Sequence, residues 1–287
     1  MPRSSFLNNT QIALDILRGI WLLRDADALL PYALRFLDRS ATQVRLDDYQ
    51  ISLASGSGNN SGKSASKTQK VLVLPIHGAL TKYETCTSYG TTDMAAALLE
   101  HASKDDVIGV VLDIDSPGGS SNAIMPLVSA INEVKAMGKP IVVHADYCAS
   151  AAMWVASQCD AIFVDNGLSE VGSIGAYATI YDSRENKQTG EKIITIYADE
   201  SGDKNKGVRE ALEGKYDTIK AELSELVKDF HAAVKAGRPD LKADAEGVLT
   251  GGMFRHAKAK ELGLIDGMGS LQWCIENVFI RAEFNNQ

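Results

Sequence analysis

The chain has 287 residues, of which 45% are hydrophobic, so it can bury a full core and we expect one main domain with appendages. Its net charge of −8 excludes nucleic acid as an expected partner, because no basic stripe rises above the acidic background. No apolar run is long enough to cross a bilayer, and residues 1–6 lack the basic-then-apolar pattern of a secretory signal. We therefore expect a cytoplasmic protein.

The four cysteines, Cys86, Cys148, Cys159 and Cys274, form no Cys-x-x-Cys pair. This spacing favours reduced, partly buried thiols over disulfides or metal ligands. No other part of the chain has metal-ligand spacing, and no glycine-rich loop precedes a lysine and a serine in the order that phosphate binding needs. We expect neither a metal nor a cofactor.

The N-terminal residues carry helical spacing of apolar side chains. The pattern predicts two short helices, at residues 10–23 and 27–38, with Pro31 in the first turn of the second. Such an arm, spanning residues 1–53, is expected to pack on its own domain or on a neighbouring subunit. A role as an arm that binds another partner is the alternative.

Residues 54–68 consist mainly of serine, glycine, asparagine and lysine. This composition has too little apolar surface to order itself and is typical of a flexible linker, which is also a candidate cleavage site. We therefore divide the chain into an N-terminal helical arm (1–53), a linker (54–69) and a catalytic domain (70–287).

In the domain that follows, short apolar runs alternate with helical patterns, which predicts an α/β fold with a mainly parallel sheet. In such sheets the reacting groups gather at the carboxyl ends of the strands. The predicted strands are 70–78, 107–114, 141–145 and 160–165, and the predicted helices are 92–101, 123–137, a helix that starts at 151, and 210–236.

Ser150 lies between a predicted buried strand and the first turns of a predicted helix. A serine at such a turn is well placed as a nucleophile, because the unpaired N–H groups of the helix start point at the group it attacks. An ordinary helix N-cap is the alternative interpretation.

The turn Ser116-Pro-Gly-Gly119 directly follows the strand 107–114. Its two glycines allow a backbone geometry that exposes an N–H without obstruction by a side chain. Together with the N–H of Ala151, it would form an oxyanion hole with two donors. Alternatively, the turn is only a tight strand-to-helix connection.

A serine nucleophile needs a base, and no histidine lies between His144 and His231. Lys204 and Lys206 follow the apolar run 193–197, and a lysine can act as a base when it is desolvated or lies near other cations. Ser173, in a Gly-Ser-Ile-Gly turn, could accept the hydrogen bond that aims the lysine. The alternative for either lysine is an ordinary solvated surface charge.

Four segments, at 116–119, 147–152, 171–175 and 259–266, resemble in order and spacing the motifs of peptidase family S49. This family includes signal peptide peptidase A and the head-maturation proteases of tailed phages. The resemblance covers residues 70–271. It implies a Ser/Lys-dyad endopeptidase with the ClpP/crotonase-like fold (a ββα superhelix), here with an N-terminal helical arm, and with a polypeptide as substrate.

By position, Ser150 matches the nucleophile and Ser173 the residue that orients the lysine. Gly118 or Gly119 matches the oxyanion donor, and Lys204 is the best match for the base.

One residue departs from the family pattern, and the choice of the base stays open between two lysines. Lys206 is the second candidate for the base. Ala151 stands where many members of the family have glycine, so its methyl group narrows the site while its N–H stays available.

The predicted N-terminal arm resembles the phage-type members, so we expect a phage or prophage capsid-assembly protease that processes scaffold or portal proteins in the cytoplasm or in an assembling procapsid. We also expect a homo-oligomer. The alternatives are a cellular protease similar to signal peptide peptidase, a crotonase-like acyl-CoA enzyme, and a non-catalytic assembly protein.

Overall fold

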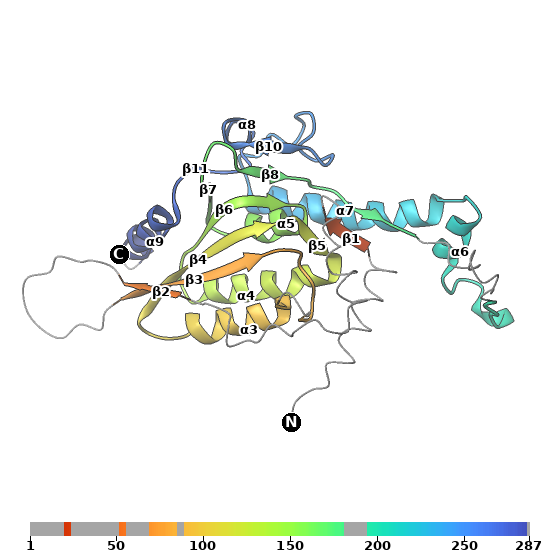
Figure 1. Ribbon diagram of the computed structural model, residues 1–287, viewed down its shortest axis with the longest axis horizontal. Coiled ribbons are helices and arrows are strands. Elements are labelled where there is room, and N and C mark those ends of the chain that lie inside the picture. Colours follow the sequence, from red (N-terminus) through yellow and green to blue (C-terminus); the bar gives the residue numbers. More distant parts are fainter. Residues whose placement is uncertain (1–19, 24–51, 56–68, 85–88, 181–193, 286–287) are drawn as a thin grey trace, which may run out of the picture.

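The structure is a computed structural model, and it describes residues 20–23, 52–55, 69–84, 89–180 and 194–285 (Figure 1). Its centre is a sheet of eight strands in the order β10-β8-β6-β4-β3-β2, with β7 beside β6 and β11 beside β7. The strands are β2 (Ser52–Ser55), β3 (Lys70–His77), β4 (Val107–Ser116), β6 (Ile141–Ala149), β7 (Ala161–Val164), β8 (Glu170–Gly172), β10 (Met253–Arg255) and β11 (Gly267–Met268).

The centre of the sheet is parallel. Strands β3, β4 and β6 run in the same direction, as do β7 and β8, which share one edge of β6. The pairs β2–β3 and β8–β10 are antiparallel. This is the predicted α/β class with a mainly parallel sheet, consistent with a ClpP/crotonase-like fold.

Both faces of the sheet are covered, which explains why its strands read as continuous apolar runs rather than alternating ones. Leu72, Leu74 and Leu112 belong to the larger core. Val71 and Val111, whose side chains point the other way, belong to a second cluster that includes residues of α9 (Leu271–Asn285).

The helices of the larger core position the functional residues. They are α3 (Thr91–Ala102), α4 (Ile124–Ala136, after the 3₁₀ turn η3, Ser121–Ala123), α5 (Ala151–Ser157) and α7 (Asp217–Gly237). Trp154 of α5 stacks on Phe230 of α7 with ring centroids 4.7 Å apart, which holds the short α5 in place. The remaining helical segments are η4 (Asp199–Ser201), α6 (Lys206–Leu212) and α8 (His256–Glu261).

A second, smaller sheet has the order β5-β1-β9. Its strands are β1 (Ile20–Leu23), β5 (Gly118–Ser120) and β9 (Tyr177–Ala178), and β1 is antiparallel to both neighbours. Figure 1 shows β1, in red, next to β5. The strands β1, β5 and β9, which are far apart in the sequence, therefore meet next to the turns that follow β4 and β6.

The strands and helices predicted between residues 70 and 165 are confirmed. The prediction of a helix at 10–23 is wrong at its C-terminal end, because Ile20–Leu23 form β1. Helical periodicity is a local pattern, and here the pairing with two distant strands outweighs it. The other residues of the predicted helices, including 27–38, lie outside the described residues.

Two further boundaries need correction. Ala54 and Ser55, the first residues of the predicted linker, extend β2 along β3. The predicted helix at 210–236 is two helices, α6 and α7, because Gly214 between them has φ of 80°. The rest of the linker lies outside the described residues, and the division into arm, linker and catalytic domain stays a prediction.

Candidate active site

Ser150 stands at the turn between β6 and α5, as predicted. Its φ of 55° and ψ of −118° lie in a region that residues other than glycine rarely adopt. Such a conformation costs on the order of 1–3 kcal/mol and persists only when the surroundings impose it. Two bonds impose it here: the Ser150 N–H donates to the Gly172 carbonyl oxygen at 2.8 Å, and the Trp154 N–H donates to the Ser150 carbonyl oxygen at 3.0 Å.

The Ser150 hydroxyl is buried and forms no hydrogen bond with any of the residues that the structure describes. A buried polar atom without a partner costs free energy, and a catalytic role is one of the reasons for which proteins keep such an atom. The hydroxyl also lies at the start of α5, where the N–H groups of the first turn, including that of Ala151, have no partner within the helix. The side chain of an ordinary helix N-cap would accept a hydrogen bond from one of these N–H groups. The Ser150 side chain forms no such bond, so Ser150 is not an ordinary N-cap.

The Ser116-Pro-Gly-Gly turn lies next to Ser150. Ser116, the last residue of β4, is paired in register with Cys148 of β6. Gly118 lies two residues after Ser116, and Ser150 lies two residues after Cys148. Both therefore lie at the same edge of two neighbouring parallel strands. In addition, β5 packs against α5. The predicted oxyanion residues and the predicted nucleophile are therefore brought together.

The two glycines of this turn differ in what their backbones do. The Gly118 N–H donates to the Ser116 hydroxyl at 3.2 Å, and that hydroxyl donates to the Gly78 carbonyl oxygen at 2.6 Å. On either side of Gly119, the Gly118 carbonyl and the Ser120 N–H both bond to Leu80. Because backbone groups alternate along a strand, the N–H of Gly119 points to the opposite edge, where β1 lies.

Gly119 must be glycine for a steric reason as well. A Cβ atom at this position would lie 2.0 Å from the Leu80 carbonyl oxygen. The close approach of the Leu80 backbone thus requires glycine at 119, and a φ of 97° favours glycine at 118, so the turn is more than an interchangeable connection.

Ser173 is held close to the nucleophile because the residue before it, Gly172, is hydrogen-bonded to Ser150. Gly172, at the end of β8, accepts the N–H of Ser150, and Ser173 also has φ of 55°. The Ser173 N–H donates to the carbonyl oxygen of Gly252 at 2.8 Å. Sequence reasoning missed this supporting role of Gly252, although the adjacent glycines 251 and 252 are a signal for a close backbone approach.

The candidate bases are not brought to the serine within one chain. Lys204 is exposed in the turn between η4 and α6. Lys206 is also exposed, with its Nζ 3.7 Å from Asp203. Figure 1 shows α6 beyond the outer end of α7, far from β5 and α5. The expectation that Lys204 would lie beside Ser150 is therefore not met inside a single protomer.

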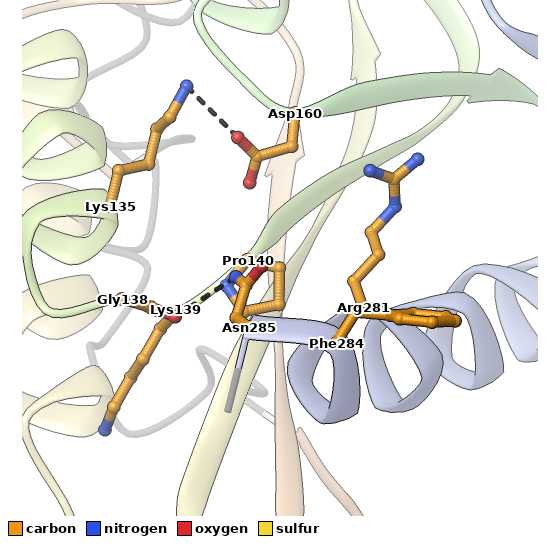
Figure 2. Close-up of a pocket in the computed structure, with 8 residues that line it drawn as sticks. All are labelled: Lys135, Gly138, Lys139, Pro140, Asp160, Arg281, Phe284 and Asn285. Carbon is orange, nitrogen blue, oxygen red and sulfur yellow. Dashed lines mark hydrogen bonds and ion pairs between the residues drawn. The ribbon is translucent and has the colours of Figure 1, made fainter. Parts of the chain in front are cut away.

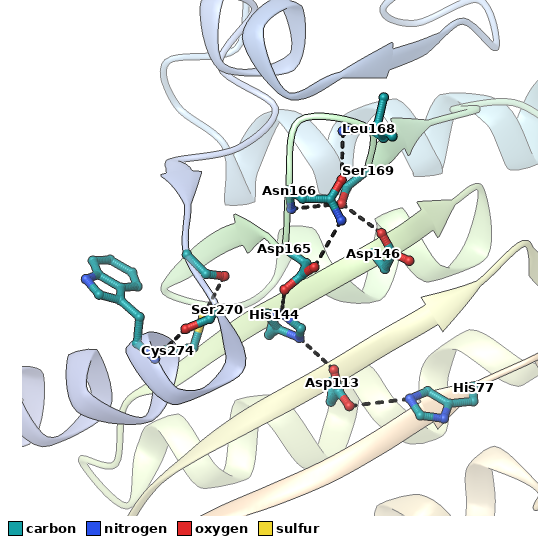
Figure 3. A network of polar contacts seen from close by, with 12 residues as sticks. His77, Asp113, His144, Asp146, Asp165, Asn166, Leu168, Ser169, Ser270 and Cys274 are labelled. Atoms are coloured by element: carbon teal, nitrogen blue, oxygen red, sulfur yellow. Dashed lines mark hydrogen bonds and ion pairs between the residues drawn. The ribbon is translucent and has the colours of Figure 1, made fainter.

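A separate polar network lies across β3, β4 and β6 (Figure 3). His144 contacts Asp113 through Nδ1 at 2.7 Å and Asp165 through Nε2 at 3.2 Å, and His77 contacts Asp113 at 3.4 Å. Asp113 and His144 point to the same face as Val111 and Val142, which belong to the cluster of α9. His144 therefore belongs to its strand, as predicted, and is not the base for Ser150.

These contacts determine the charges of the network. Burial opposes protonation of His144, but its bonds to Asp113 and Asp165 outweigh that effect and raise its pKa. The bond to Asp113 raises the pKa of His77. Burial likewise opposes ionisation of Asp113, but the bonds to both histidines lower its pKa. No group of three or more histidine, cysteine or acidic residues within the described ranges is arranged to hold a metal ion.

A pocket of about 510 Å³ lies at the other end of β6 (Figure 2). It is lined by Pro140, which precedes β6, and by three cationic side chains, each of which forms at least one hydrogen bond or ion pair. Lys135 pairs with Asp160 at 3.2 Å, Lys139 donates to the backbone oxygens of residues 102 and 104, and Arg281 donates to Asn277 at 2.7 Å. The pocket lies at the opposite end of β6 from Ser150, and its lysines hold neighbouring segments of the chain together.

Three of the cysteines lie within the described part of the chain, and all three are free and buried. Burial raises the pKa of the Cys148 thiol, which makes it a poor nucleophile although it lies two residues from Ser150. Burial also raises the pKa of Cys274 to about 12. This agrees with the prediction of reduced structural thiols. Among the described residues, none of the helices combines the length and the apolar character that a membrane span requires.

The fold and this site define an α/β protein in which a serine, held in a strained turn, faces a helix start and a Gly-Gly turn. The chain belongs to peptidase family S49, whose sequence model matches residues 133–283. The resemblance that the motifs indicated is thereby confirmed.

Two curated relatives and one solved structure illustrate the similarity. Protease 4 of Haemophilus influenzae is 25% identical over 239 residues, covering 81% of this chain and 37% of that protein. The head-tail preconnector protein GP5 of Enterobacteria phage P21 is 25% identical over 234 residues, covering 77% of this chain and 44% of that protein. The 1510-N membrane-bound stomatin-specific protease is 17% identical with a TM-score of 0.46, covering 76% of this chain and 86% of that one. The chain thus spans less than half the length of these two curated relatives.

Proposed function

We propose that this protein is a serine endopeptidase in which the Ser150 hydroxyl attacks the carbonyl carbon of a peptide bond. The observation that carries the proposal is a buried hydroxyl without a hydrogen-bond partner among the described residues, on a residue with φ of 55°, at the start of α5. Such strain and such an unsatisfied group are costly, and both are expected where a nucleophile must stay free to react. Membership of peptidase family S49 supports the same reaction.

In this proposal the N–H groups of Gly119 and Ala151 stabilise the oxyanion. The Gly119 N–H points away from Leu80, and Ala151 is the first residue of α5. Each such donor is worth about 3 kcal/mol in the transition state. Gly118 contributes mainly by shaping the turn, because its own N–H already donates to Ser116.

The proposed base is Lys204, supplied by a second copy of the chain. Lys204 is exposed just before α6 and the second candidate, Lys206, is the exposed first residue of α6, a helix that Figure 1 shows far from α5. The segment before them also exposes two large apolar side chains, with Ile194 82% and Ile196 88% exposed. Because burial of these two side chains against another chain would be favourable, we infer that a neighbouring protomer covers this segment in a homo-oligomer.

The proton and bond changes of the reaction then follow. The neutral amine of Lys204, desolvated at the interface, takes the proton of the Ser150 hydroxyl, and Ser173 orients the amine. The oxygen of Ser150 bonds to the carbonyl carbon, the peptide C–N bond breaks, and the amine product leaves with a proton from the lysine. Water then hydrolyses the ester in a second step that regenerates the serine.

The biological role that we propose is processing of scaffold or portal proteins during capsid assembly of a phage or prophage. It is supported by the similarity to the phage preconnector protein and takes place in the cytoplasm or in an assembling procapsid. A cellular protease similar to signal peptide peptidase is the alternative, and the similarity to Protease 4 supports it. The division into an N-terminal arm, a linker and a catalytic domain (70–287) is part of this proposal, with the start of the linker moved from residue 54 to residue 56 because Ala54 and Ser55 belong to β2.

A serine-directed acylating probe and casein hydrolysis test the proposal together. The intact chain should hydrolyse casein and be labelled by the probe at Ser150, as located by peptide mass mapping. Ser150→Ala should lose both properties, whereas Cys148→Ala, two residues away, should keep the labelling. An unlabelled Ser150 in a well-folded chain that hydrolyses no peptide would overturn the proposal and leave the acyl-CoA enzyme and the non-catalytic assembly protein as explanations.

A further inference from the structure

The strand β1 lies between two segments that flank the candidate active site. Trp21, Leu22 and Leu23 are opposite Ser120, Gly119 and Gly118 of β5. On its other side, β1 is antiparallel to β9, with Trp21 opposite Tyr177. A short stretch from the beginning of the chain is thus built into the sheet that borders Ser150.

Without β1, the strands β5 and β9 would be separated by the width of one strand. Neighbouring strands lie about 4.8 Å apart, so the gap between β5 and β9 is about 10 Å wide. The opposite edge of β5 is occupied by the backbone of Leu80, and the N–H of Gly119 faces the gap. The gap therefore offers backbone donors and acceptors on both sides to an extended peptide.

The gap leads to the nucleophile. Gly118 and Ser150 follow the paired residues Ser116 and Cys148, so the Gly118 end of β5 lies at Ser150. Because β1 is antiparallel to β5, it runs towards this end and places Leu22 and Leu23 opposite the two glycines. The other wall, β9, follows shortly after Ser173. A peptide in the position of β1 thus has its backbone beside the proposed oxyanion donors.

We propose that the gap between β5 and β9 is the groove in which this protein binds an extended peptide, and that β1 occupies this groove as an intramolecular ligand that competes with substrate. Addition of a strand between two edges gives affinity through backbone hydrogen bonds. Since a tethered segment reaches an effective concentration in the millimolar range, β1 keeps the groove filled. The sequence of β1, Ile-Trp-Leu-Leu, makes this intramolecular ligand an extended apolar segment. The inference rests on the proposed peptidase function for its effect on catalysis, but the occupancy of the groove can be tested without it.

The first test uses a disulfide to detect the position of β1 in the full-length chain carrying Ser150→Ala. Opposite residues of antiparallel strands have Cα atoms close enough for a disulfide. Trp21→Cys combined with Tyr177→Cys should cross-link under mild oxidation, because these residues are paired in register. Trp21→Cys with Ala178→Cys is the matched control, since adjacent residues point to opposite faces of the strand. Equal cross-linking of both pairs, or of neither, would overturn the placement of β1.

The second test measures whether β1 blocks the groove. Leu22→Pro removes a backbone donor from β1, whereas Leu22→Val keeps it and is the control. Both are made in the full-length Ser150→Ala chain and titrated with a fluorescein-labelled peptide that has the sequence of residues 19–24. The peptide should bind the proline variant at least about tenfold more tightly than the valine variant, because the intramolecular competitor has been displaced. Equal affinities for two folded variants would overturn the proposal, and the disulfide test decides the case if the proline variant does not fold.

The third test connects occupancy to catalysis in chains with Ser150 intact. Leu22→Pro should lower KM for an apolar peptide by about tenfold with little change in kcat, compared with Leu22→Val. An unchanged KM in active enzymes would overturn the competition. If neither variant hydrolyses peptides while the labelled peptide still binds as expected, the proposed peptidase function fails and the groove assignment stands.

Discussion

The N–H of Ser150 donates a 2.8 Å hydrogen bond to the carbonyl oxygen of Gly172, which links the start of α5 to the end of β8. Both Ser150 and Ser173, the residue after Gly172, have φ of 55°. Two strained turns are thus joined by one backbone hydrogen bond, so a change that moves Gly172 should also move Ser150. Gly172 has φ of 130°, and its backbone lies close to that of Gly252.

The first prediction concerns this link. A Cβ atom at Gly172 would lie 2.3 Å from the Gly252 carbonyl oxygen, so Gly172→Ala should lower the free energy of unfolding by about 1–3 kcal/mol and reduce peptide hydrolysis. Gly167→Ala is the matched control, because nothing lies within 4 Å of its added Cβ atom, and we expect a change within about 0.5 kcal/mol. Urea unfolding and casein hydrolysis measure the two effects. Equal stability and activity of both variants would show that the link does not position the serine.

The second prediction compares two substitutions of the nucleophile. Ser150→Ala keeps a side chain at φ of 55°, whereas Ser150→Gly removes the strain. The strain is on the order of 1–3 kcal/mol and glycine costs about 0.5–1 kcal/mol in chain entropy, so the glycine variant should be about 1 kcal/mol more stable than the alanine variant. Both should lack hydrolysis. Thermal and urea unfolding measure the difference, and a glycine variant less stable than the alanine variant would contradict the strain at this position.

The sequence predicted the parts of the molecule that local patterns determine. The strands leading to Ser116 and Cys148 are continuous apolar runs because both faces of the sheet are covered, and the turns that carry Gly118 and Ser150 follow them directly. These residues therefore meet once the strands are parallel neighbours. The site was predictable to this extent.

The parts that depend on pairing between distant segments were not predictable. Residues 20–23 continue an apparent helical pattern, and only the presence of β5 and β9 makes them a strand. The position of Lys204 depends on where α7 carries α6, since Gly214 turns the chain between these two helices. No spacing in the sequence reports that distance. The motif therefore identifies a candidate base, but it does not predict where in the fold this lysine lies.

The third prediction concerns the network of Asp113, His144 and His77. The raised pKa of His144 means that its contribution to stability is complete below the unfolded value of 6.5 and is lost as the pH rises through the folded value. The lowered pKa of Asp113 means that its contribution is present above the unfolded value of 3.8 and is lost as the pH falls through the folded value. The network should therefore stabilise the fold most between about pH 4 and pH 6.5.

Asp113→Asn tests this dependence, because it removes a charge that raises the pKa of both histidines. The free energy of unfolding of the unchanged chain should fall between pH 6 and pH 9, as measured by urea denaturation, and the decrease should be smaller in the variant. His256→Gln is the control, since it removes a histidine outside the network, at the start of α8. A variant whose stability falls as steeply as that of the unchanged chain would show that the network is not the source.

The fourth prediction tests whether Lys204 acts across a subunit boundary. Ser150→Ala and Lys204→Ala should each be inactive, but an equimolar mixture should recover activity after subunit exchange. A mixed oligomer contains sites in which one copy supplies Ser150 and its neighbour supplies Lys204. With random mixing, such sites make up about a quarter of the total, so about a quarter of the unchanged activity should return.

The matched control mixes Ser150→Ala with the double variant Ser150→Ala/Lys204→Ala, which provides no intact serine and should stay inactive. The same series with Lys206→Ala decides between the two lysines, because only the variant that lacks the true base is inactive by itself. Complementation requires the serine and the lysine to come from different copies. If both single variants are inactive and their mixture stays inactive after verified subunit exchange, Lys204 must act on the serine of its own chain, and α6 must then move a long way from its position at the outer end of α7.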